Sequence, residues 1–425
     1  MLWCTLHDTL KDRSICIVPV ANIILLNISG DDRIGLSSDF YSVISQVDVR
    51  ILDIGQSVIH DQVSQGMMLQ LPDDQDVEQT KSALKKHAKR LGLKIKIRDI
   101  SLEAYDKWVG QQGAERYTLT LLTREVSAEE IARVTQVTAE QGLNIHDIVR
   151  LSGRVPINRP ISNEVKSCIE FSVQGSPKNS AAMRASFLKI ASELDIDIAI
   201  QRDDAFRRNR RLVCFDMDST LIEAEVIDEL AKRAGVGDQV AEITELAMQG
   251  KLDFTESFTR RMALLEGLSE TVLEDIAANL PLMEGARTLI KNLQAYGYKT
   301  AILSGGFNYF GHHLQRELGI DHVYANALEI VDGKLTGRVI HPVVNAERKA
   351  QLLKQIAAEE GLDPQQTIAV GDGANDLLML AEAGLGIAFR AKPLVRESAK
   401  QSMSTHGLDG ILYLLGFKDQ DIQRA

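Results

Sequence analysis

The sequence predicts an α/β protein in two unequal parts: two small antiparallel sandwiches, then a parallel sheet with an inserted helical cap. Three observations support this fold class. The first 204 residues repeat one strand–helix–strand–strand–helix–strand pattern. Short apolar runs beyond residue 211 end in acidic, hydroxyl or glycine residues, which is typical of parallel strands buried on both faces. A long stretch of helical periodicity separates the first two of these runs.

Each copy of the repeat should form an antiparallel sheet covered by helices on one face. The predicted elements of the first copy are residues 21–29, 35–46, 49–59, 67–71, 77–90 and 93–99. Those of the second copy are residues 116–123, 127–142, 145–151, 167–173, 179–194 and 196–201, where Ser127 and Glu130 form a capping box. A polar, aperiodic joint at 106–113 separates the copies. We therefore expect domains at 1–105, including an N-terminal leader, and at 113–204.

Composition and charge argue against several classes of protein. The chain has 425 residues, 48 basic and 59 acidic, and its net charge of −11 argues against a nucleic-acid partner. No run of about 18 apolar residues occurs, so we expect no membrane span. Asp8 and Asp12 precede the first apolar stretch, at 15–28, which argues against a signal peptide. Four cysteines without metal-ligand spacing favour a reducing cytoplasm.

An arginine cluster at 207–211 marks the start of the second part, a domain expected at 208–425. Because the chain is acidic overall, we expect a solvated linker here rather than a nucleic-acid surface.

Two carboxylates, Asp216 and Asp218, directly follow the first buried strand predicted in this domain. Parallel sheets bind ligands at the carboxyl ends of their strands, and residues i and i+2 point to one side. Burying both carboxylates there is unfavourable unless a positive charge meets them. The reference pKa of aspartate is about 3.9, so we expect Asp216 to be ionised and able to attack phosphorus without a base.

Later strands supply the complementary groups. The second apolar run ends in Ser304 and Gly305, whose hydroxyl and backbone N–H groups suit phosphate oxygens. Lys349, near the start of a predicted helix, offers a positive charge to the same phosphate. The third run precedes Asp372, a hard oxygen ligand of the kind that Mg²⁺ prefers. The sequence therefore predicts a phosphate and magnesium site at one edge of the sheet.

These motifs, in this order, resemble those of the haloacid dehalogenase-type phosphatases. The matching positions are 216–220, 304–306, 349 and 371–376. The resemblance implies a Rossmann-like core with a helical cap at about 223–285. It also implies that Mg²⁺ is held by the carboxylates of Asp216 and Asp372 and by the backbone carbonyl of Asp218.

Within that superfamily the chain is similar to the phosphoserine phosphatases, which implies hydrolysis of O-phospho-L-serine through an aspartyl-phosphate. Asp216 would be the nucleophile, and Asp218 the general acid and then the base. The phosphate would be bound by Ser304, Gly305, Lys349 and Asn375. Asp376 would orient Lys349 or a metal-bound water.

The cap should recognise the amino-acid part of the substrate. By resemblance, Glu225 binds the amino group, Arg261 the carboxylate, and Met248 and Phe254 line an apolar wall. Helical spacing relates Phe254, Ser257, Phe258 and Arg261, so Arg261 shares a face with Phe254. Arg260 is turned about 100° away and is expected in solvent.

The two N-terminal repeats resemble ACT domains, on the turn at 30–35 and the strand at 51–56. This implies an amino-acid effector and a homodimer formed by sheet edges. Three alternatives stay open from the sequence. The chain could transfer the phosphoryl group to another alcohol, it could be an amino-acid sensor with minor catalysis, or the repeats could serve only dimerisation.

Overall fold

The computed structural model describes residues 22–47, 49–158, 166–249 and 251–424. The expected N-terminal leader, the stretch tested for a signal peptide up to residue 21, Cys4 and Cys16 lie outside these residues. The chain divides into two units, Met1–Gly113 and Ala114–Ala425. Within the described ranges, no helix combines the length and apolarity needed to cross a bilayer.

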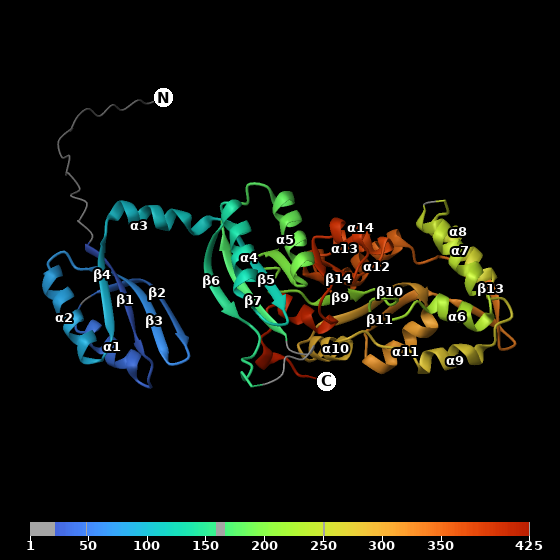
Figure 1. The fold of residues 1–425 in the computed structure, drawn as a ribbon, viewed down its shortest axis with the longest axis horizontal. Helices are drawn as coiled ribbons and strands as arrows, with labels where there is room; N and C mark the ends of the chain where they lie inside the picture. Colours follow the sequence, from blue (N-terminus) through green and yellow to red (C-terminus); the bar gives the residue numbers. More distant parts are fainter. Residues whose placement is uncertain (1–21, 48, 159–165, 250, 425) are drawn as a thin grey trace, which may run out of the picture. The chain divides into compact units, whose positions relative to one another are not determined.

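Unit 1 is the first predicted sandwich (Figure 1). Its elements are β1 (Asn22–Asp31), α1 (Leu36–Ile44), β2 (Arg50–Ile59), β3 (Gln62–Leu71), α2 (Val77–Arg90) and β4 (Lys94–Ile100). The sheet is antiparallel with strand order β2-β3-β1-β4. Apolar side chains of the central strands, such as Ile24 and Leu69, share one core with Phe40 of α1 and Leu84 of α2. The alternation of apolar residues thus places both helices on one face, as predicted.

The joint after unit 1's sheet is helical, which corrects the aperiodic segment expected at 106–113. Helix α3 spans Leu102–Val109 and a 3₁₀ turn follows at Gly110–Gly113. Ser101 caps the helix, because its side chain accepts a hydrogen bond from the N–H of Ala104 (3.2 Å). None of its residues is buried. Its apolar residues Leu102, Tyr105 and Val109 do recur at helical spacing, so the sequence carried a short helical pattern that the expectation overlooked.

Unit 2 begins with the second sandwich. Its elements are β5 (Arg116–Thr123), α4 (Ala128–Glu140), β6 (Asn144–Arg150), β7 (Ser167–Gln174), α5 (Ser180–Leu194) and β8 (Asp197–Arg202). The strand order β6-β7-β5-β8 repeats that of unit 1, which confirms the internal repeat. The predicted capping box is present, since Ser127 and Glu130 exchange hydrogen bonds at the start of α4.

The second sandwich shares its core with the part of the chain that follows it. Leu122 and Cys168, on the sheet face away from α4 and α5, lie in one apolar cluster with Leu412. Asp197 at the start of β8 accepts hydrogen bonds from the backbone N–H groups of Ser404, Thr405 and His406 (2.6–3.2 Å). These contacts join the sandwich to the parallel-sheet domain within unit 2.

The arginine cluster at this junction is not a solvated linker, and that expectation was wrong for two of its members. Arg207 and Arg210 are only 9% and 5% exposed. Arg207 pairs with Glu170 (2.6 Å), and Arg210 donates to the side chain of Gln201 (2.8 Å). Partners from the second sandwich therefore allow both guanidinium groups to be buried.

The remainder of unit 2 is built on a six-stranded parallel sheet of order β11-β10-β9-β14-β15-β16. The strands are β9 (Leu212–Phe215), β10 (Lys299–Phe307), β11 (His322–Asn326), β14 (Thr367–Gly371), β15 (Leu385–Phe389) and β16 (Gln401–Met403). In β9, Leu212 and Cys214 belong to one apolar cluster and Val213 and Phe215 to another. The central strand is thus buried on both faces, as its apolar run predicts.

Helices cover both faces of this sheet (Figure 1). On one side lie α10 (Ala286–Ala295) and α11 (Asn308–Leu318), and on the other α12 (Ala346–Glu359), α13 (Leu377–Glu382) and α14 (Pro393–Ser398). The insertion between β9 and β10 is helical, with α6 (Val226–Ala234), α7 (Gly237–Met248), α8 (Phe254–Ala263) and α9 (Glu270–Ala278). A hairpin of β12 (Leu328–Val331) and β13 (Lys334–Val339) contacts this cap.

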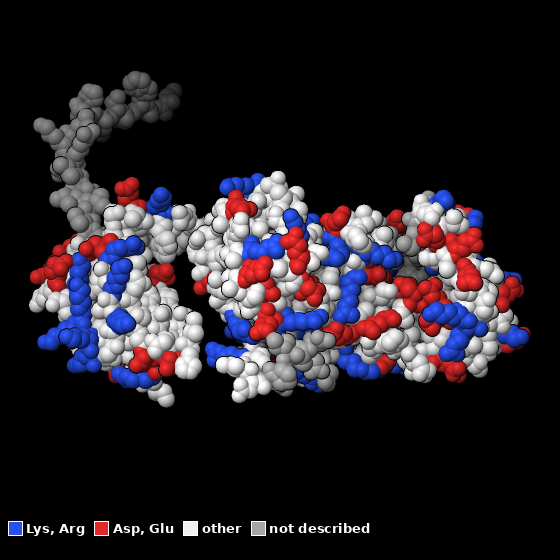
Figure 2. All heavy atoms as spheres, in the orientation of Figure 1, with Lys and Arg blue, Asp and Glu red and all other residues white. Residues whose placement is uncertain are grey.

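Acidic and basic side chains are intermixed over unit 2 on the face drawn in Figure 2. An intermixed surface produces only a weak net field at a distance.

Candidate active site

The sheet topology brings the predicted motifs together. Strand β9 lies between β10 and β14, so the segments that follow these three strands meet at one edge of the sheet. The N–H of Asp216 donates to the carbonyl of Val370 (2.9 Å), which extends the pairing of β9 with β14 by one residue. Asp216 and Asp372 are consequently placed side by side, although 155 residues separate them in sequence.

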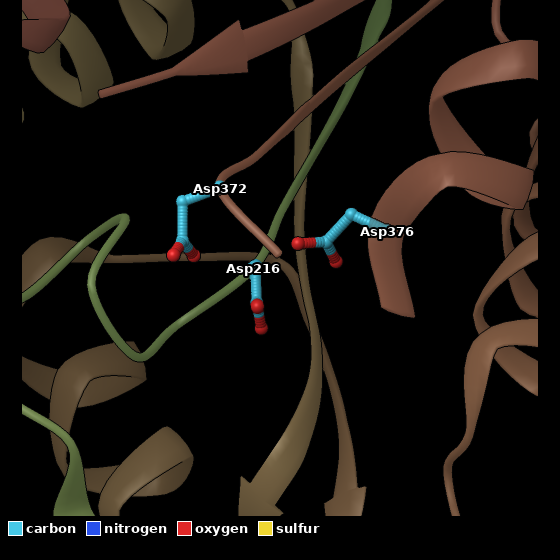
Figure 3. A group of neighbouring side chains, drawn as sticks. All are labelled: Asp216, Asp372 and Asp376. Carbon is cyan, nitrogen blue, oxygen red and sulfur yellow. The ribbon is translucent and has the colours of Figure 1, made fainter. Parts of the chain in front are cut away.

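Three buried carboxylates converge at this edge: Asp216, Asp372 and Asp376 (Figure 3). One oxygen from each lies within 4.8 Å of the others. The ammonium group of Lys349, which is fully buried on α12, contacts Asp216 (2.9 Å) and Asp376 (2.8 Å). Asp376 also accepts a hydrogen bond from the N–H of Gly373 (2.9 Å). Asp376 therefore contacts Lys349 directly.

The electrostatics of the cluster favour a further cation. Burial raises the pKa of Asp216 well above its usual value, and the charge of Asp376 raises it further, against the effect of Lys349. Burial and Asp376 likewise raise the pKa of Asp372 to about 6. Burial alone would lower the pKa of Lys349, but the charges of Asp216 and Asp376 outweigh it and raise that pKa. One ammonium group thus faces three carboxylates, and hard oxygen donors in this number fit Mg²⁺.

The raised pKa of Asp216 departs from the reference value of about 3.9 on which the expectation of an ionised Asp216 rested. The sequence indicates that the Asp216 and Asp218 carboxylates are buried and need a positive charge, but not that Asp376 lies close enough to raise the pKa of Asp216 further. Because removing water disfavours the charged form, the anionic state of Asp216 depends on the cations beside it.

Asp218 lies next to this cluster and has a different environment. Burial, followed by the charge of Glu225, raises the pKa of Asp218 to about 7. Its carboxyl group accepts hydrogen bonds from the N–H of Val226 (2.9 Å) and the hydroxyl of Ser304 (3.4 Å). A carboxyl group that keeps its proton near neutral pH is suited to general-acid catalysis.

The site opens into a cavity of about 780 Å³ between the cap and the sheet edge. Of the predicted residues, those that line it are Asp216, Asp218, Glu225, Phe254, Arg261, Gly305, Asp372 and Asn375. Ser304, Lys349 and Asp376 are fully buried behind that lining. Ser304 supports the wall, because its hydroxyl accepts a hydrogen bond from the N–H of Gly306 (2.8 Å).

The cap contributes groups of both signs to the cavity. Glu225 lies at the exposed rim, where it accepts a hydrogen bond from the hydroxyl of Ser219 (2.8 Å). Arg261 lies on the same face of α8 as Phe254, two helical turns further along, and burial lowers the pKa of its guanidinium group. Arg260 points elsewhere and pairs with Glu256 (2.6 Å). The predicted wall residue Met248 ends α7, and its side chain lies outside the described part of the structure.

Two chain segments connect the cap to the core, and they run side by side. The N–H of Glu223 donates to the carbonyl of Pro281 (2.8 Å), and the N–H of Met283 donates to Leu221 (2.9 Å). Arg390, just after β15, pairs with Glu284 of the return segment (2.6 Å) and lies 3.7 Å from Glu223. The first and last segments of the cap therefore contact each other and Arg390 at the same place on the core.

Sequence reasoning missed several residues of the cavity lining, among them Thr244, Ala247, Leu252, Asn345, Glu347 and Lys392. Lys392 follows β15, the strand next to β14 in the sheet, so strand order could have suggested it. The cap residues carry no comparable signal, because helical periodicity alone does not separate a side chain facing a cavity from one facing another helix.

Comparison with known proteins agrees with this architecture. A family model for haloacid dehalogenase-like hydrolases matches residues 210–384, and two ACT-domain models match residues 22–98 and 116–201. The phosphoserine phosphatase SerB2 of Mycobacterium tuberculosis is 39% identical, over 96% of both chains. The phosphoserine phosphatase of Streptomyces coelicolor is 38% identical, over 95% of this chain and 94% of the relative. A solved structure, the probable phosphoserine phosphatase of Vibrio cholerae, is 36% identical with a TM-score of 0.56, over 70% of this chain and 86% of that one.

The fold and the site therefore define a haloacid dehalogenase-like hydrolase that carries two ACT domains. More narrowly, the chain belongs to the phosphoserine phosphatase family.

Gly306 offers a test of the geometry at the sheet edge. A Cβ atom at this position would lie 2.4 Å from Oδ2 of Asp218 and 2.9 Å from Met217. Gly306→Ala should therefore displace the Asp218 carboxyl group and lower kcat for phosphomonoester hydrolysis about 100-fold. Gly237→Ala, in α7 with open space around it, is the matched control and should retain full turnover. Full turnover by Gly306→Ala would contradict this placement of Asp218.

Proposed function

We propose that this chain hydrolyses O-phospho-L-serine to L-serine and phosphate, the last step of serine biosynthesis. The observation that carries the proposal is the charge arrangement of the cavity: Asp216 and Asp218 at the sheet edge face Arg261 and Glu225 of the cap. The carboxylate and ammonium groups of one small ligand would meet Arg261 and Glu225 there. Its phosphate would lie beside Asp216, where Lys349 and a bound cation would balance the negative charge. The names of the full-length relatives support the same substrate.

Magnesium is the proposed cofactor, held by the carboxylates of Asp216 and Asp372 and the backbone carbonyl of Asp218. When bound, Mg²⁺ would neutralise charge on the phosphate oxygens and on the buried carboxylates. Phosphatases of the haloacid dehalogenase type generally use this ion. The donor set and the raised pKa values of Asp216 and Asp372 are the local observations that support it.

In the proposed mechanism, an oxygen of Asp216 attacks phosphorus and the bond from phosphorus to the seryl oxygen breaks, giving an aspartyl-phosphate. Asp218 donates its proton to the departing seryl oxygen. It then accepts a proton from the water that hydrolyses the intermediate. We propose that Ser304, Gly305 and Asn375 position the phosphate, and that Lys349 stabilises its charge from behind Asp216.

Several further assignments stay predictions. They are the domain limits 1–105, 113–204 and 208–425 with a cap at about 223–285, the apolar role of Met248 and Phe254, a homodimer, a cytoplasmic location, and the lack of nucleic-acid and membrane partners. The matches of the family models to 22–98, 116–201 and 210–384 support the domain limits.

The reaction and its nucleophile can be tested together. Phosphate release from a panel of phosphomonoesters should be fastest with O-phospho-L-serine and should require Mg²⁺. Asp216→Asn should lower kcat at least about a thousandfold, because an amide cannot attack phosphorus. Asp238→Asn, an exposed residue of α7, is the control. Full activity of Asp216→Asn, or ³²P label on another side chain after acid quenching, would refute the mechanism.

Arg260, next to Arg261 on α8, is the control for the proposed contact between Arg261 and the substrate carboxylate. Arg261→Ala should raise KM for O-phospho-L-serine about 100-fold, since charged hydrogen bonds to the substrate are lost. Arg260→Ala should change KM less than about twofold, because Arg260 is half exposed and its ion pair, with Glu256, lies on its own helix. Steady-state kinetics of both variants give the comparison. Equal effects of the two substitutions would contradict the assignment.

The proposed effector is an amino acid, and L-serine, the product, is the first candidate. The full chain should bind L-serine, measured by calorimetry, with a change in kcat/KM for O-phospho-L-serine. Removing unit 1, residues 1–113, is expected to weaken that response if the effector binds there. If L-serine binds only in competition with the substrate, the regulatory proposal fails while the catalytic one stands.

A further inference from the structure

Ser257 has a buried hydroxyl group that the proposed mechanism does not use. Its side chain lies in the middle of α8, is 1% exposed and lines the cavity. The Oγ atom makes no hydrogen bond to any residue in the described part of the chain. Burying a hydroxyl without a partner is unfavourable, so this group calls for an explanation.

Other hydroxyl groups of the cap helices show how such a group is ordinarily satisfied. The hydroxyl of Thr244 donates to the carbonyl of Val240 (2.9 Å), and that of Thr259 donates to Thr255 (2.7 Å). Each bonds to the carbonyl four residues earlier on its own helix. Ser257 could do the same, yet its Oγ is left unbonded beside the cavity.

A second unpartnered donor lies one turn further along the same helix. The Nε of Arg261 is buried and makes no hydrogen bond within the described residues. Ser257 and Arg261 are four residues apart, so their side chains neighbour each other on one helix face. Both line the same cavity. The hydroxyl O–H of Ser257 and the Nε–H of the Arg261 guanidinium group thus lie on one helix face without an acceptor among the described residues.

We propose that Ser257 is a specificity-determining hydrogen-bond donor to the carboxylate of the substrate, beside the contact already assigned to Arg261. This inference rests on the proposed function. Arg261 can offer Nε–H and a terminal N–H as a fork to the two carboxylate oxygens. A carboxylate has about four lone-pair positions, so it can also accept the hydroxyl proton of Ser257. The ligand class is a phosphomonoester that bears a carboxylate close to its phosphate.

This assignment explains why the hydroxyl is left without a partner. A group that is buried and unpaired in the free protein lowers its stability but is ready to bind a ligand acceptor. Removing the Ser257 hydroxyl should therefore leave stability unchanged or raise it, while weakening substrate binding. A serine that merely supported the helix would give the opposite result for stability.

The test compares substrates with and without the carboxylate. Ser257→Ala should lower kcat/KM for O-phospho-L-serine about tenfold or more, mainly through KM, because a hydrogen bond to a charged group is lost. The same variant should change kcat/KM less than about twofold for O-phosphoethanolamine and p-nitrophenyl phosphate, which lack that carboxylate. Its thermal unfolding temperature should not fall.

Two further variants complete the experiment. Thr259→Ala, which removes an exposed and satisfied hydroxyl from the same helix, should affect none of the three substrates. Ser257→Thr keeps the hydroxyl and should retain most of the preference for O-phospho-L-serine.

Three outcomes would overturn the proposal: an equal loss on all three substrates, no loss on O-phospho-L-serine, or a preference that Ser257→Thr loses as fully as Ser257→Ala. A wild-type protein that hydrolyses p-nitrophenyl phosphate but not O-phospho-L-serine would instead refute the proposed function. The two failures are therefore distinguishable.

Discussion

The buried contact of Lys349 with Asp216 and Asp376 is the constraint on which the rest of the catalytic unit depends. Taking three charged groups out of water is costly and is offset only when their geometry is good. Asp216 follows β9, Lys349 lies on α12 and Asp376 precedes α13, so these elements must meet in one arrangement for the charges to pair. The pairing is incomplete, since Asp372 lies beside Asp216 with a raised pKa. The three carboxylates at the sheet edge therefore carry more negative charge than Lys349 balances. A bound cation would offset this excess and allow a phosphate to bind there.

Glycine residues leave room for the closely packed carboxyl groups at the sheet edge. A Cβ atom at Gly371 would lie 2.4 Å from the carboxyl carbon of Asp376, and one at Gly306 would be as close to Asp218. The glycines of the two motifs are therefore needed for close packing against carboxylates, in addition to any contact of their N–H groups with phosphate. The helical cap covers the cavity at the sheet edge. Arg390 pairs with Glu284 of the return segment and lies close to Glu223 of the outgoing segment, so these two segments form one hinge between the cap and the core.

Much of the fold could be predicted from the sequence, because alternating and continuous apolar runs record which strand faces are buried. Both sandwiches and the central parallel strands were recognised in this way, and the motif order placed Asp216, Asp218 and Asp372 at one sheet edge. Other features depend on tertiary partners that no local pattern encodes. Arg207 and Arg210 are buried because Glu170 and Gln201 lie opposite them. The raised pKa of Asp216 and the unbonded hydroxyl of Ser257 depend equally on what surrounds each group, so neither could be read from the chain.

The second sandwich is structurally part of the catalytic unit, which bears on how regulation could reach the site. Asp197 holds the backbone of residues 404–406, and two residues later the N–H of Leu408 donates to the carbonyl of Glu284 (2.8 Å). Glu284 is the residue that Arg390 fastens at the cap hinge. A continuous set of contacts therefore runs from the first residue of β8 to the return segment of the cap. Cutting the chain near residue 207 would remove Asp197 and expose Leu412 and its apolar neighbours, so it would disturb this hinge as well as remove the sandwich. Changes in activity after such a cut would mix lost regulation with a loosened cap, whereas a cut at Gly113 leaves these contacts intact.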